Sequence, residues 1–475
     1  NKALHLNDNI KHFYLLLTEI YSKQGKFNES VKVYQQLLKK VPKTDGYLYN
    51  LAEAQIYDRK YDDAIKTLNQ IEKLFGKSDE ISKQKQRLYM FLNKTDEAIN
   101  EAKSLVEANP NEPQHKTALA ELLLSLNKKN EAFLLLEKVS QENPDDAYAH
   151  LMLYEYYKNT NQPDLAYKSL NKAFGKSLSI DNKVSIVLSL MSDAEKSEEK
   201  RKLLIELTQK IVDQHPNEAK SHSILGDVFL IANENEKALS SFKNAINLDA
   251  SKNKIWQKII TMSADMKQID SMVVYSEKAI ELFPNDPLLW YFKGTGKFLN
   301  KDYREAAKAL EFGKKLSSKE ERLNSQFLSQ LGDVYHNLNE HKKSDEAFGE
   351  VLKRDSNNAH VLNNYSYFLS LRKENLETAE RLSLKLIHLY PNNPTYLDTY
   401  AWVLYSMKKY KKAKEALSNV IDLTNNAIIL EHYGDILFKL GEQEKAVEFW
   451  KKALEGEGEY SEFLQKKIEE KKIYE

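Results

Sequence analysis

The apolar residues near the end of the chain recur with the period of an α-helix. In residues 427–454, AIILEHYGDILFKLGEQEKAVEFWKKAL, they fall at steps of three and four on either side of Gly441. This spacing places them on one face of a helix, and a glycine between two such stretches marks a tight turn. The segment therefore predicts two amphipathic helices joined at Leu440–Gly441. The apolar positions are Leu430, Tyr433, Leu437 and Leu440 in the first helix, and Ala446, Phe449, Trp450, Ala453 and Leu454 in the second.

Small residues interrupt the apolar face of each helix. Gly434 and Ala446 stand where large residues would otherwise fall, so the two backbones can approach closely. Counted from residue 427, they are positions 8 and 20, and the same phase recurs along the chain. It defines 13 units, which are 11–44, 45–78, 79–112, 113–146, 147–180, 181–218, 219–252, 253–286, 287–324, 325–358, 359–393, 394–426 and 427–460.

The small positions keep their phase through most of these units. Position 20 is occupied by Ser30, Ala64, Ala98, Ala132, Ala166, Ala238, Ala306, Ser344, Ala379, Ala413 and Ala446. Position 8 is occupied by Gly226, Gly294, Gly332 and Gly434, and by Ala52, Ala120 and Ala401. The pattern resembles the tetratricopeptide repeat, abbreviated TPR, in which large residues at positions 4, 7, 11 and 24 surround these small ones.

The resemblance implies an all-α fold. One such unit cannot bury its apolar face alone and must stack on copies of itself. We therefore expect a right-handed TPR superhelix, an α-solenoid of about 13 helix-turn-helix repeats, with a C-terminal capping helix in residues 461–475. Proline placement agrees with this register, because each proline falls at a predicted helix boundary. The ten are Pro42, Pro110, Pro113, Pro144, Pro163, Pro216, Pro284, Pro287, Pro391 and Pro394.

Departures from the pattern predict the domain organisation. Repeat 181–218 is four residues longer than the usual unit. It places Leu188 and Leu204 at the small positions. Repeat 253–286 places Ile260 and Met272 there. We expect an N-terminal array in 1–180, a degenerate repeat with a bend in 181–218, a C-terminal array in 219–460 and the cap in 461–475. Residues 1–8, with Ala3 at position 27, resemble the tail of a truncated repeat, which predicts sequence upstream.

Composition and motifs argue against several classes of function. The 70 basic and 70 acidic residues cancel, so bulk charge does not attract nucleic acid or an anionic membrane. Without cysteine, thiol catalysis and thiolate metal sites are excluded. The 11 histidines form no metal-binding motif, and neither a phosphate-binding glycine loop nor a GxSxG motif occurs. We therefore expect no catalytic residues, no metal and no cofactor, and a protein or peptide as the partner.

The resemblance also implies that the first helix of each repeat lines a concave groove, with positions 2, 5, 9, 12 and 13 facing into it. In the N-terminal array, position 9 is mainly acidic, which favours a basic or polar peptide. The alternative is that these carboxylates are an ordinary solvated face. The acidic residues are Glu19, Glu53, Glu121 and Glu155, and a weaker apolar patch is expected at Tyr291 and Phe298.

The last three repeats carry the stronger candidate site. Trp402 occupies position 9, whereas Trp256, Trp290 and Trp450 occupy core positions 4 and 24. Aromatic side chains surrounded by carboxylates and amides are typical of a peptide-binding hot spot. The alternative is that Trp402 packs as plain structure near the end of the array. The predicted partner-binding residues are Asn363, Tyr367, Asp398, Trp402, Tyr405, Glu431, Asp435 and Phe438.

Three segments of the C-terminal third suggest a narrower relationship. Residues 363–369 (NNYSYFL), 396–403 (YLDTYAWV) and 431–435 (EHYGD) resemble segments of bacterial TPR proteins made as outer-membrane-associated lipoproteins, notably in Bacteroidota. The resemblance implies a non-catalytic periplasmic scaffold for outer-membrane or secretion assembly, held at the membrane only through a lipid anchor upstream of this chain. The alternatives are a cytoplasmic TPR adaptor and a regulatory subunit of an enzyme complex.

The acidic N-terminal groove predicts an effect of charge reversal. If Glu19, Glu53, Glu121 and Glu155 attract a basic segment, changing all four to Lys should weaken binding of that segment and reduce its dependence on salt. Titrations at low and high ionic strength measure both effects. Unchanged affinity and unchanged salt dependence would show that these carboxylates are a solvated face.

Overall fold

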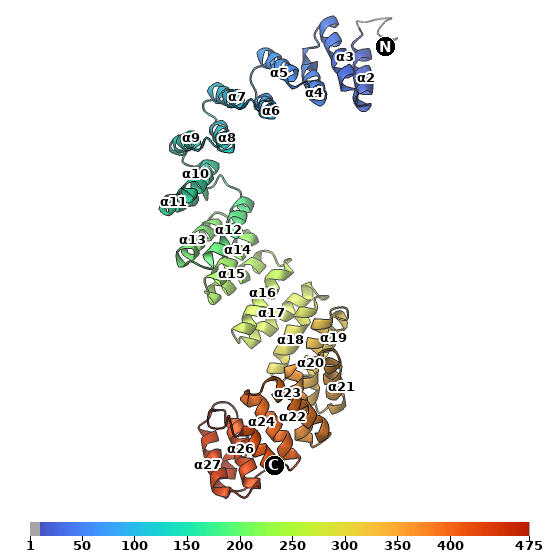
Figure 1. Cartoon of the computed structure of the whole chain (residues 1–475), viewed down its shortest axis with the longest axis vertical. Coiled ribbons are helices and arrows are strands. Elements are labelled where there is room, and N and C mark those ends of the chain that lie inside the picture. The colour runs from blue at the N-terminus through green and yellow to red at the C-terminus, as the bar shows by residue number, and fades with distance from the viewer. Residues whose placement is uncertain (1–9, 475) are drawn as a thin grey trace. The chain divides into compact units, whose positions relative to one another are not determined.

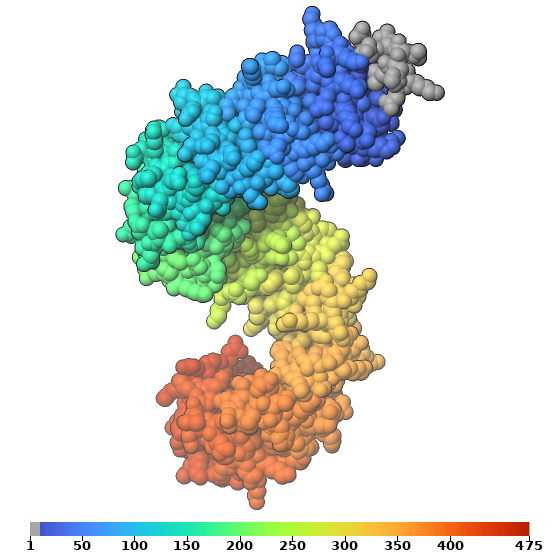
Figure 2. All heavy atoms as spheres, turned by 45° about the horizontal axis from the view of Figure 1, so that its top comes forward, coloured from blue at the N-terminus to red at the C-terminus, as the bar shows by residue number. Residues whose placement is uncertain are grey.

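The computed structural model describes residues 10–474, and within them the chain is all-α, as predicted. This part contains 27 α-helices, one short 3-10 helix and no strand (Figure 1). It divides into two compact units, unit 1 (residues 1–233) and unit 2 (residues 234–475). The predicted role of Ala3 lies outside the described residues. Figure 2 shows the surface of each unit with its colours in chain order, because each helix packs mainly on helices close to it in sequence.

Unit 1 consists of helix pairs that match the predicted repeats. Its helices are α2 (Lys11–Lys23), α3 (Phe27–Lys40), η1 (Asp45–Tyr47), α4 (Leu48–Tyr57), α5 (Tyr61–Phe75), α6 (Asp79–Phe91), α7 (Thr95–Ala108), α8 (Pro113–Ser125), α9 (Lys129–Glu142), α10 (Ala147–Asn159), α11 (Pro163–Ala173), α12 (Ile180–Ala194), α13 (Glu198–Gln214) and α14 (Ala219–Ile231).

Unit 2 continues with the same helix spacing. Its helices are α15 (Asn235–Leu248), α16 (Asn253–Asp265), α17 (Ile269–Leu282), α18 (Pro287–Leu299), α19 (Tyr303–Leu316), α20 (Glu321–Asn337), α21 (His341–Arg354), α22 (Ala359–Arg372), α23 (Leu376–Leu389), α24 (Pro394–Ser406), α25 (Tyr410–Leu417), α26 (Ala427–Lys439), α27 (Gln443–Leu454) and α28 (Leu464–Glu470). The last, α28, packs on α27 and buries Leu464, as expected for a capping helix.

The turn inside each repeat has one recurring backbone conformation. Position 15 has positive φ in every repeat except 181–218, and in eleven of these repeats the next residue donates its N–H to the carbonyl of position 11. This arrangement ends a helix with a left-handed residue, which Gly and Asn tolerate best. The residues at position 15 are Gly25, Arg59, Asn93, Asn127, Asn161, Asn233, Lys267, Lys301, Asn339, Lys373, Lys408 and Gly441.

The predicted small positions are where the two helices of a repeat come closest. The eleven Ala and Ser residues predicted at position 20 are all buried. A Cβ added to Gly434 would lie 2.5 Å from Cδ1 of Trp450, and one added to Gly332 would lie 2.3 Å from Cε1 of Phe348. Both large partners stand at position 24 of the same repeat. The register is therefore confirmed, and all ten prolines lie in turns or at the first residue of a helix.

Two core positions were predicted wrongly. Leu188 is not at a small buried position, because it is 54% exposed and Val187 takes the inward place beside it. The buried residues of α12 are Lys183, Val187 and Ala194, which recur at steps of four and seven, so its buried face is a narrow stripe that leaves Leu188 outside. Trp290 is only partly buried, with its ring against Phe312. The bend predicted at 181–218 stays a prediction.

Position 4 has a role that the apolar pattern did not reveal. A ring nitrogen at this position bonds to the backbone carbonyl six residues earlier, at the end of the preceding repeat, in both units. This contact satisfies a carbonyl that the helix end leaves without an intrahelical partner. The pairs are His150 with Pro144 at 3.0 Å, His222 with Pro216 at 2.8 Å, Trp256 with Ala250 at 2.9 Å and Trp290 with Pro284 at 2.8 Å.

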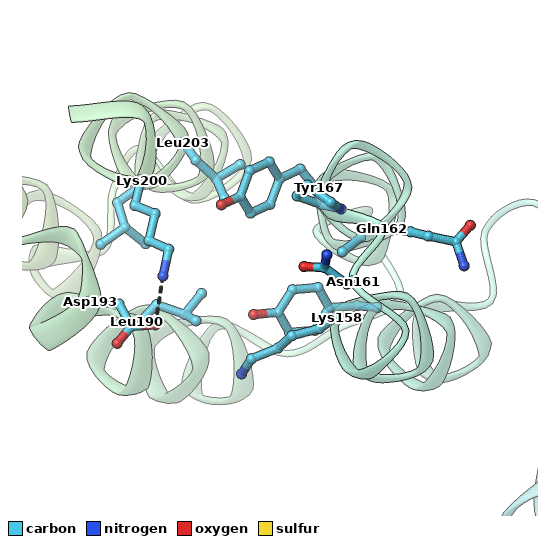
Figure 3. A pocket seen from close by; sticks show the side chains of 12 residues that line it. Lys158, Asn161, Gln162, Tyr167, Leu190, Asp193, Lys200 and Leu203 are labelled. Carbon is cyan, nitrogen blue, oxygen red and sulfur yellow. Dashed lines mark hydrogen bonds and ion pairs between the residues drawn. The ribbon is translucent and has the colours of Figure 1, made fainter. Parts of the chain in front are cut away.

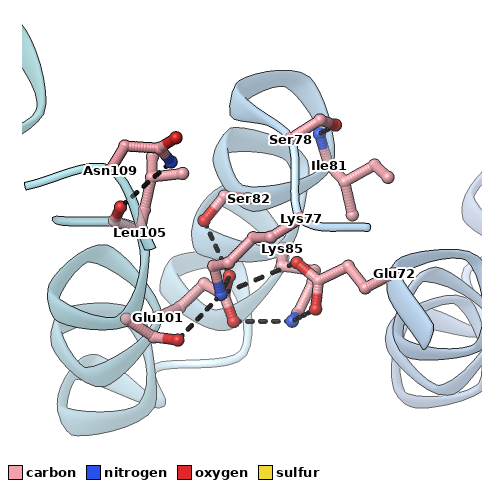
Figure 4. A network of polar contacts seen from close by, with 10 residues as sticks. Glu72, Lys77, Ser78, Ile81, Ser82, Lys85, Glu101, Leu105 and Asn109 are labelled. Atoms are coloured by element: carbon pink, nitrogen blue, oxygen red, sulfur yellow. Dashed lines mark hydrogen bonds and ion pairs between the residues drawn. The ribbon is translucent and has the colours of Figure 1, made fainter. Parts of the chain in front are cut away.

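A buried ionic network joins three helices of unit 1 (Figure 4). Lys85 on α6 contacts Glu72 on α5 at 2.8 Å and Glu101 on α7 at 2.6 Å. Glu101 also accepts hydrogen bonds from Lys77 at 2.8 Å and Ser82 at 2.7 Å. Burial opposes the charge of Lys85, but the hydrogen bonds to Glu101 and Glu72 outweigh burial and raise its pKa. The network ties two neighbouring repeats together through charges that cannot be left unpaired.

The close helix contacts predict the effect of larger side chains. Gly434→Leu and Ala413→Leu should each lower the free energy of unfolding by about 1–3 kcal/mol, because both sites are fully packed. Lys451→Leu, at an exposed position of α27, should change it by less than about 0.5 kcal/mol. Denaturant titration of the three variants measures these differences, and equal stability of all three would contradict the register.

Candidate peptide-binding site

The first helices of successive repeats in unit 2 are connected by polar side chains. At each junction from α18 to α28, a residue at position 5 or 9 bonds to a side chain of the next element, usually at position 6. The bonds are Thr295–Gln330 at 2.9 Å, Asp333–Asn364 at 2.8 Å, Asn363–Thr399 at 2.8 Å, Asp398–His432 at 3.0 Å and Asp435–Lys467 at 2.7 Å. We call this series the polar ladder.

Several of the residues predicted to bind a partner belong to the polar ladder. Asn363 accepts a hydrogen bond from the Thr399 hydroxyl and donates one to Asn364. Asp398 is 6% exposed, and both of its oxygens lie 3.0 Å from Nδ1 of His432. These side chains hold neighbouring repeats in register. Their role in partner binding stays a prediction.

Lys467 of the capping helix pairs with the last two carboxylates of the groove face. Its ammonium group is buried and lies 2.8 Å from Glu431 and 2.7 Å from Asp435. Asp435 also accepts a hydrogen bond from the indole of Trp450 at 2.9 Å. Burial opposes the charge of Glu431, but hydrogen bonds from Lys467 and Ser461 outweigh it and lower the Glu431 pKa. Burial dominates at Asp435 and raises its pKa.

Trp402 lies between two other rings. Its indole is stacked on Tyr405 with centroids 4.6 Å apart and on His432 with centroids 3.9 Å apart. Tyr405 is buried, whereas Trp402 and Tyr367 are partly exposed. Burial raises the pKa of Tyr367 to about 12, so its hydroxyl stays protonated at neutral pH. Trp402 thus has a structural contact on each side and still presents part of its surface to solvent.

A cavity of about 370 Å³ opens beside these rings. Five of the eight predicted residues line it, and the structure brings them together from α22, α24 and α26. Asn363 and Asp398 lie outside the lining, as does Phe438, whose ring stacks on Trp450 in the core. The lining consists of Tyr367, Ser370, Leu371, Lys373, Trp402, Tyr405, Ser406, Ile428, Glu431, His432, Asp435, Glu459, Tyr460, Ser461, Lys467 and Tyr474.

The sequence interpretation missed the residues that complete this site. His432 stands at position 6, Tyr460 is the final residue of the last repeat, and Lys467 and Tyr474 belong to the segment after it. One signal was present in the sequence, because position 6 is polar in four successive repeats. These residues are Gln330, Asn364, Thr399 and His432. No pattern indicated Lys467, because its partners lie more than 30 residues earlier.

The other predicted groove residues lie apart from this cavity. Glu19, Glu53, Glu121 and Glu155 are exposed on α2, α4, α8 and α10. Glu19 is paired with Lys23 at 2.7 Å. Tyr291 packs edge-on against Phe327 and lines a cavity of about 780 Å³ with Asp333 and His360. Phe298 packs against Tyr303 instead. Peptide binding by these residues stays a prediction.

The described residues show neither a metal cluster nor a membrane-spanning helix. Within 10–474, three or more metal-ligating side chains are nowhere grouped closely enough to hold a metal ion. Over the same residues, every helix falls short of the length and apolarity that crossing a membrane requires.

The Asp398–His432 pair predicts a dependence of stability on pH. Burial disfavours the charged imidazole, but the Asp398 carboxylate outweighs burial, with smaller contributions from Asp435 and Glu431, and raises the His432 pKa above 6.5. A raised pKa in the folded state stabilises fully below the unfolded pKa, and this contribution is lost as pH rises through the folded pKa. Asp398→Asn should therefore reduce the fall in unfolding free energy between about pH 6 and 9.

Denaturant titrations of the wild-type chain and the variant across this range measure the fall. Asp422→Asn, at an exposed position of unit 2, is the matched control and should leave the fall unchanged. An identical pH dependence in the wild type and the Asp398 variant would show that the pair contributes nothing to it.

Comparison with known proteins places the repeats in a family. Models of the tetratricopeptide repeat match residues 17–79 and 87–147, and also 325–358 and 427–455. A TPR repeat-containing protein of Methanocaldococcus jannaschii is 26% identical over 209 residues, 41% of this chain and 35% of that protein. The type IV pilus assembly protein PilF of Pseudomonas aeruginosa is 32% identical over 148 residues, 30% of this chain and 58% of that protein.

The chain thus covers about a third and about three fifths of the length of these two relatives. A solved tetratricopeptide repeat protein from Parabacteroides merdae aligns with 53% of this chain and 98% of its own, at 15% identity and a TM-score of 0.45. Most helix pairs between the matched segments keep the same spacing and the same left-handed turn, and repeat 181–218 departs from both. The matched segments are thus tetratricopeptide repeats, and the fold of the chain is that of a TPR solenoid.

Proposed function

We propose that this protein is a non-catalytic scaffold that binds a peptide segment of a protein partner in the 370 Å³ cavity of unit 2. One observation carries the proposal. The aromatic rings of Trp402 and Tyr367 are partly exposed in a concavity, whereas the carboxylates around them are buried and paired within the chain. When a ligand buries aromatic surface that is exposed in a concavity of the free protein, that burial contributes most of the binding free energy.

The shape and polarity of the cavity favour a peptide as the ligand. Its volume accommodates one or two bulky side chains, and the exposed parts of the Trp402 and Tyr367 rings offer apolar surface against which they can pack. At the rim, Lys373, Glu459 and Ser461 provide charged and polar groups for the peptide backbone and flanking residues. The anchor therefore consists of the aromatic rings, and the ladder carboxylates fix the shape of the cavity.

The proposal predicts that Trp402→Ala weakens peptide binding by about 2 kcal/mol or more. Peptides selected from a random library on the wild-type chain serve as ligands, and calorimetry measures their affinities. Because Trp402 is stacked on two rings, the variant should also unfold more easily, by about 1–3 kcal/mol. Leu371→Ala separates the two effects, because Leu371 lines the cavity and is 45% exposed. It should weaken binding without changing stability.

Trp256→Ala is the matched control. This buried tryptophan on α16 lies outside the lining, so its loss should lower stability and leave affinity unchanged in the folded protein. Selected peptides that bind the Trp402 and Leu371 variants as well as the wild type would contradict the proposed site.

We further propose that the scaffold works in the bacterial cell envelope, as a periplasmic protein anchored at the outer membrane and serving an outer-membrane or secretion assembly. The lipoprotein-like segments at 363–369, 396–403 and 431–435 support this location. A relative at 32% identity is a type IV pilus assembly protein, which supports an assembly role. Fractionation of the cells that make the protein, with protease treatment of intact and permeabilised cells, tests the location. Recovery with cytoplasmic markers would favour the cytoplasmic adaptor instead.

A further inference from the structure

Unit 1 contains a cavity that belongs to none of the sites described above. It lies between the pair α10–α11 and the pair α12–α13, with a volume of about 220 Å³ (Figure 3). Figure 3 shows Tyr167 reaching from α11 toward Leu203 on α13, and the Lys200–Asp193 ion pair at one edge. The lining is Tyr154, Lys158, Asn161, Gln162, Pro163, Ala166, Tyr167, Leu190, Asp193, Lys200, Leu203 and Leu204.

Two irregularities of the repeat pattern leave this space unfilled. Tyr154 occupies position 8, where seven of the repeats have Gly or Ala, and its side chain lines the cavity. The next pair is longer than usual, with 15 residues in α12 and 17 in α13, so it departs from the regular packing of its neighbours. Close-packed repeats fill such a junction with their own side chains.

The interior of the cavity fits one bulky apolar side chain. Leu190, Leu203 and Leu204 form one wall, and the rings of Tyr154 and Tyr167 form the other. A cavity of ~150 Å³ with a similar apolar lining binds benzene in another protein, and this one is larger. An aromatic side chain therefore fits without displacing any residue of the wall.

The charges at the rim of the cavity determine which residues can flank that side chain in a bound segment. Lys200 is paired with Asp193 at 2.9 Å, and this bond lowers the Asp193 pKa, so the pair is formed at neutral pH. Lys158 has no ion-pair partner among the described residues and lies 5.6 Å from the Tyr154 ring centroid. One uncompensated positive charge therefore stands at the opening. The exposed side-chain amides of Asn161 and Gln162 lie at the same rim and can bond to peptide groups.

We propose that this cavity is a second peptide-binding site, which takes an aromatic side chain of a partner segment and pairs an adjacent acidic residue of that segment with Lys158. The site is independent of the proposed function of unit 2, because its lining comes wholly from α10 to α13. A single positive charge does not suit a nucleic acid, which requires a row of cations. The rim amides favour a peptide over a free aromatic acid, which would leave them unused.

Calorimetric titration of the full chain with short peptides tests the proposal. The probe is acetyl-Gly-Glu-Trp-Glu-Gly-amide, and the comparison peptides replace its Trp by Ala or both Glu by Lys. The probe should bind at least tenfold more tightly than the Ala peptide, because the ring fills the cavity. It should bind about fivefold more tightly than the Lys peptide, because Lys158 repels that one. Equal affinities for the three peptides would overturn the proposal, and so would indole-3-acetate binding as tightly as the probe.

Variants of the protein locate the binding. Leu203→Trp and Leu190→Trp each fill the cavity from one wall, and either one that folds should abolish probe binding. Lys158→Glu should reverse the preference between the Glu and Lys peptides. Lys168→Glu, exposed on α11 outside the lining, is the matched control and should retain the wild-type preference. Trp402→Ala should leave probe affinity unchanged. Loss of binding in that variant, or retention in both filled variants, would overturn the assignment.

Discussion

The close approach of the two helices within each repeat is the constraint on which the rest of the structure depends. A small residue at position 20, with Gly or Ala at position 8 of most repeats, lets the backbones come so near that a Cβ on Gly434 would overlap Trp450. The left-handed residue at position 15 turns the chain back on itself at the required distance. A pair built in this way has an apolar face that its own residues cannot cover, so each pair must stack on the next. One local rule thus produces a repeating fold of indefinite length.

The polar ladder of unit 2 adds a second constraint and decides which groups remain for a ligand. Stacking buries the carboxylates at positions 5 and 9, and a buried charge must find a partner. His432 provides the partner for Asp398, and Lys467 provides it for Glu431 and Asp435. Aromatic rings carry no such requirement, so Trp402 and Tyr367 keep part of their surface open. The recognition surface that we propose is therefore aromatic, and the acidic residues around it act as its framework.

The sequence was sufficient to predict features that repeat and insufficient for features that occur once. Positions 8 and 20, the turn at Gly441 and the ten prolines lie where the periodic pattern places them, because the same local contacts recur in each repeat. Three aromatic residues that line the candidate cavity, Tyr367, Trp402 and Tyr405, were also among the predicted residues, since Trp402 departs from the positions that the other tryptophans occupy. The burial of Asp398 and Glu431 was not, because their partners lie more than 30 residues away on another element. Leu188 was misplaced because the repeat pattern assigns position 8 to the core, whereas the narrow buried face of α12 ends at Val187.

Both cavities proposed as binding sites lie where the repeat pattern breaks. Where repeats pack regularly, the large residues of one pair fill most of the space against the next. At the junction of α10–α11 with α12–α13, a tyrosine occupies position 8 and the second hairpin is longer than usual, and a cavity is left between the two pairs. At the end of unit 2, the capping segment lines the candidate cavity with Lys467 and Tyr474 instead of the apolar helix pair of a further repeat. The regular repeats thus supply stability and a continuous surface, while both proposed sites use an irregularity to make room for an inserted side chain.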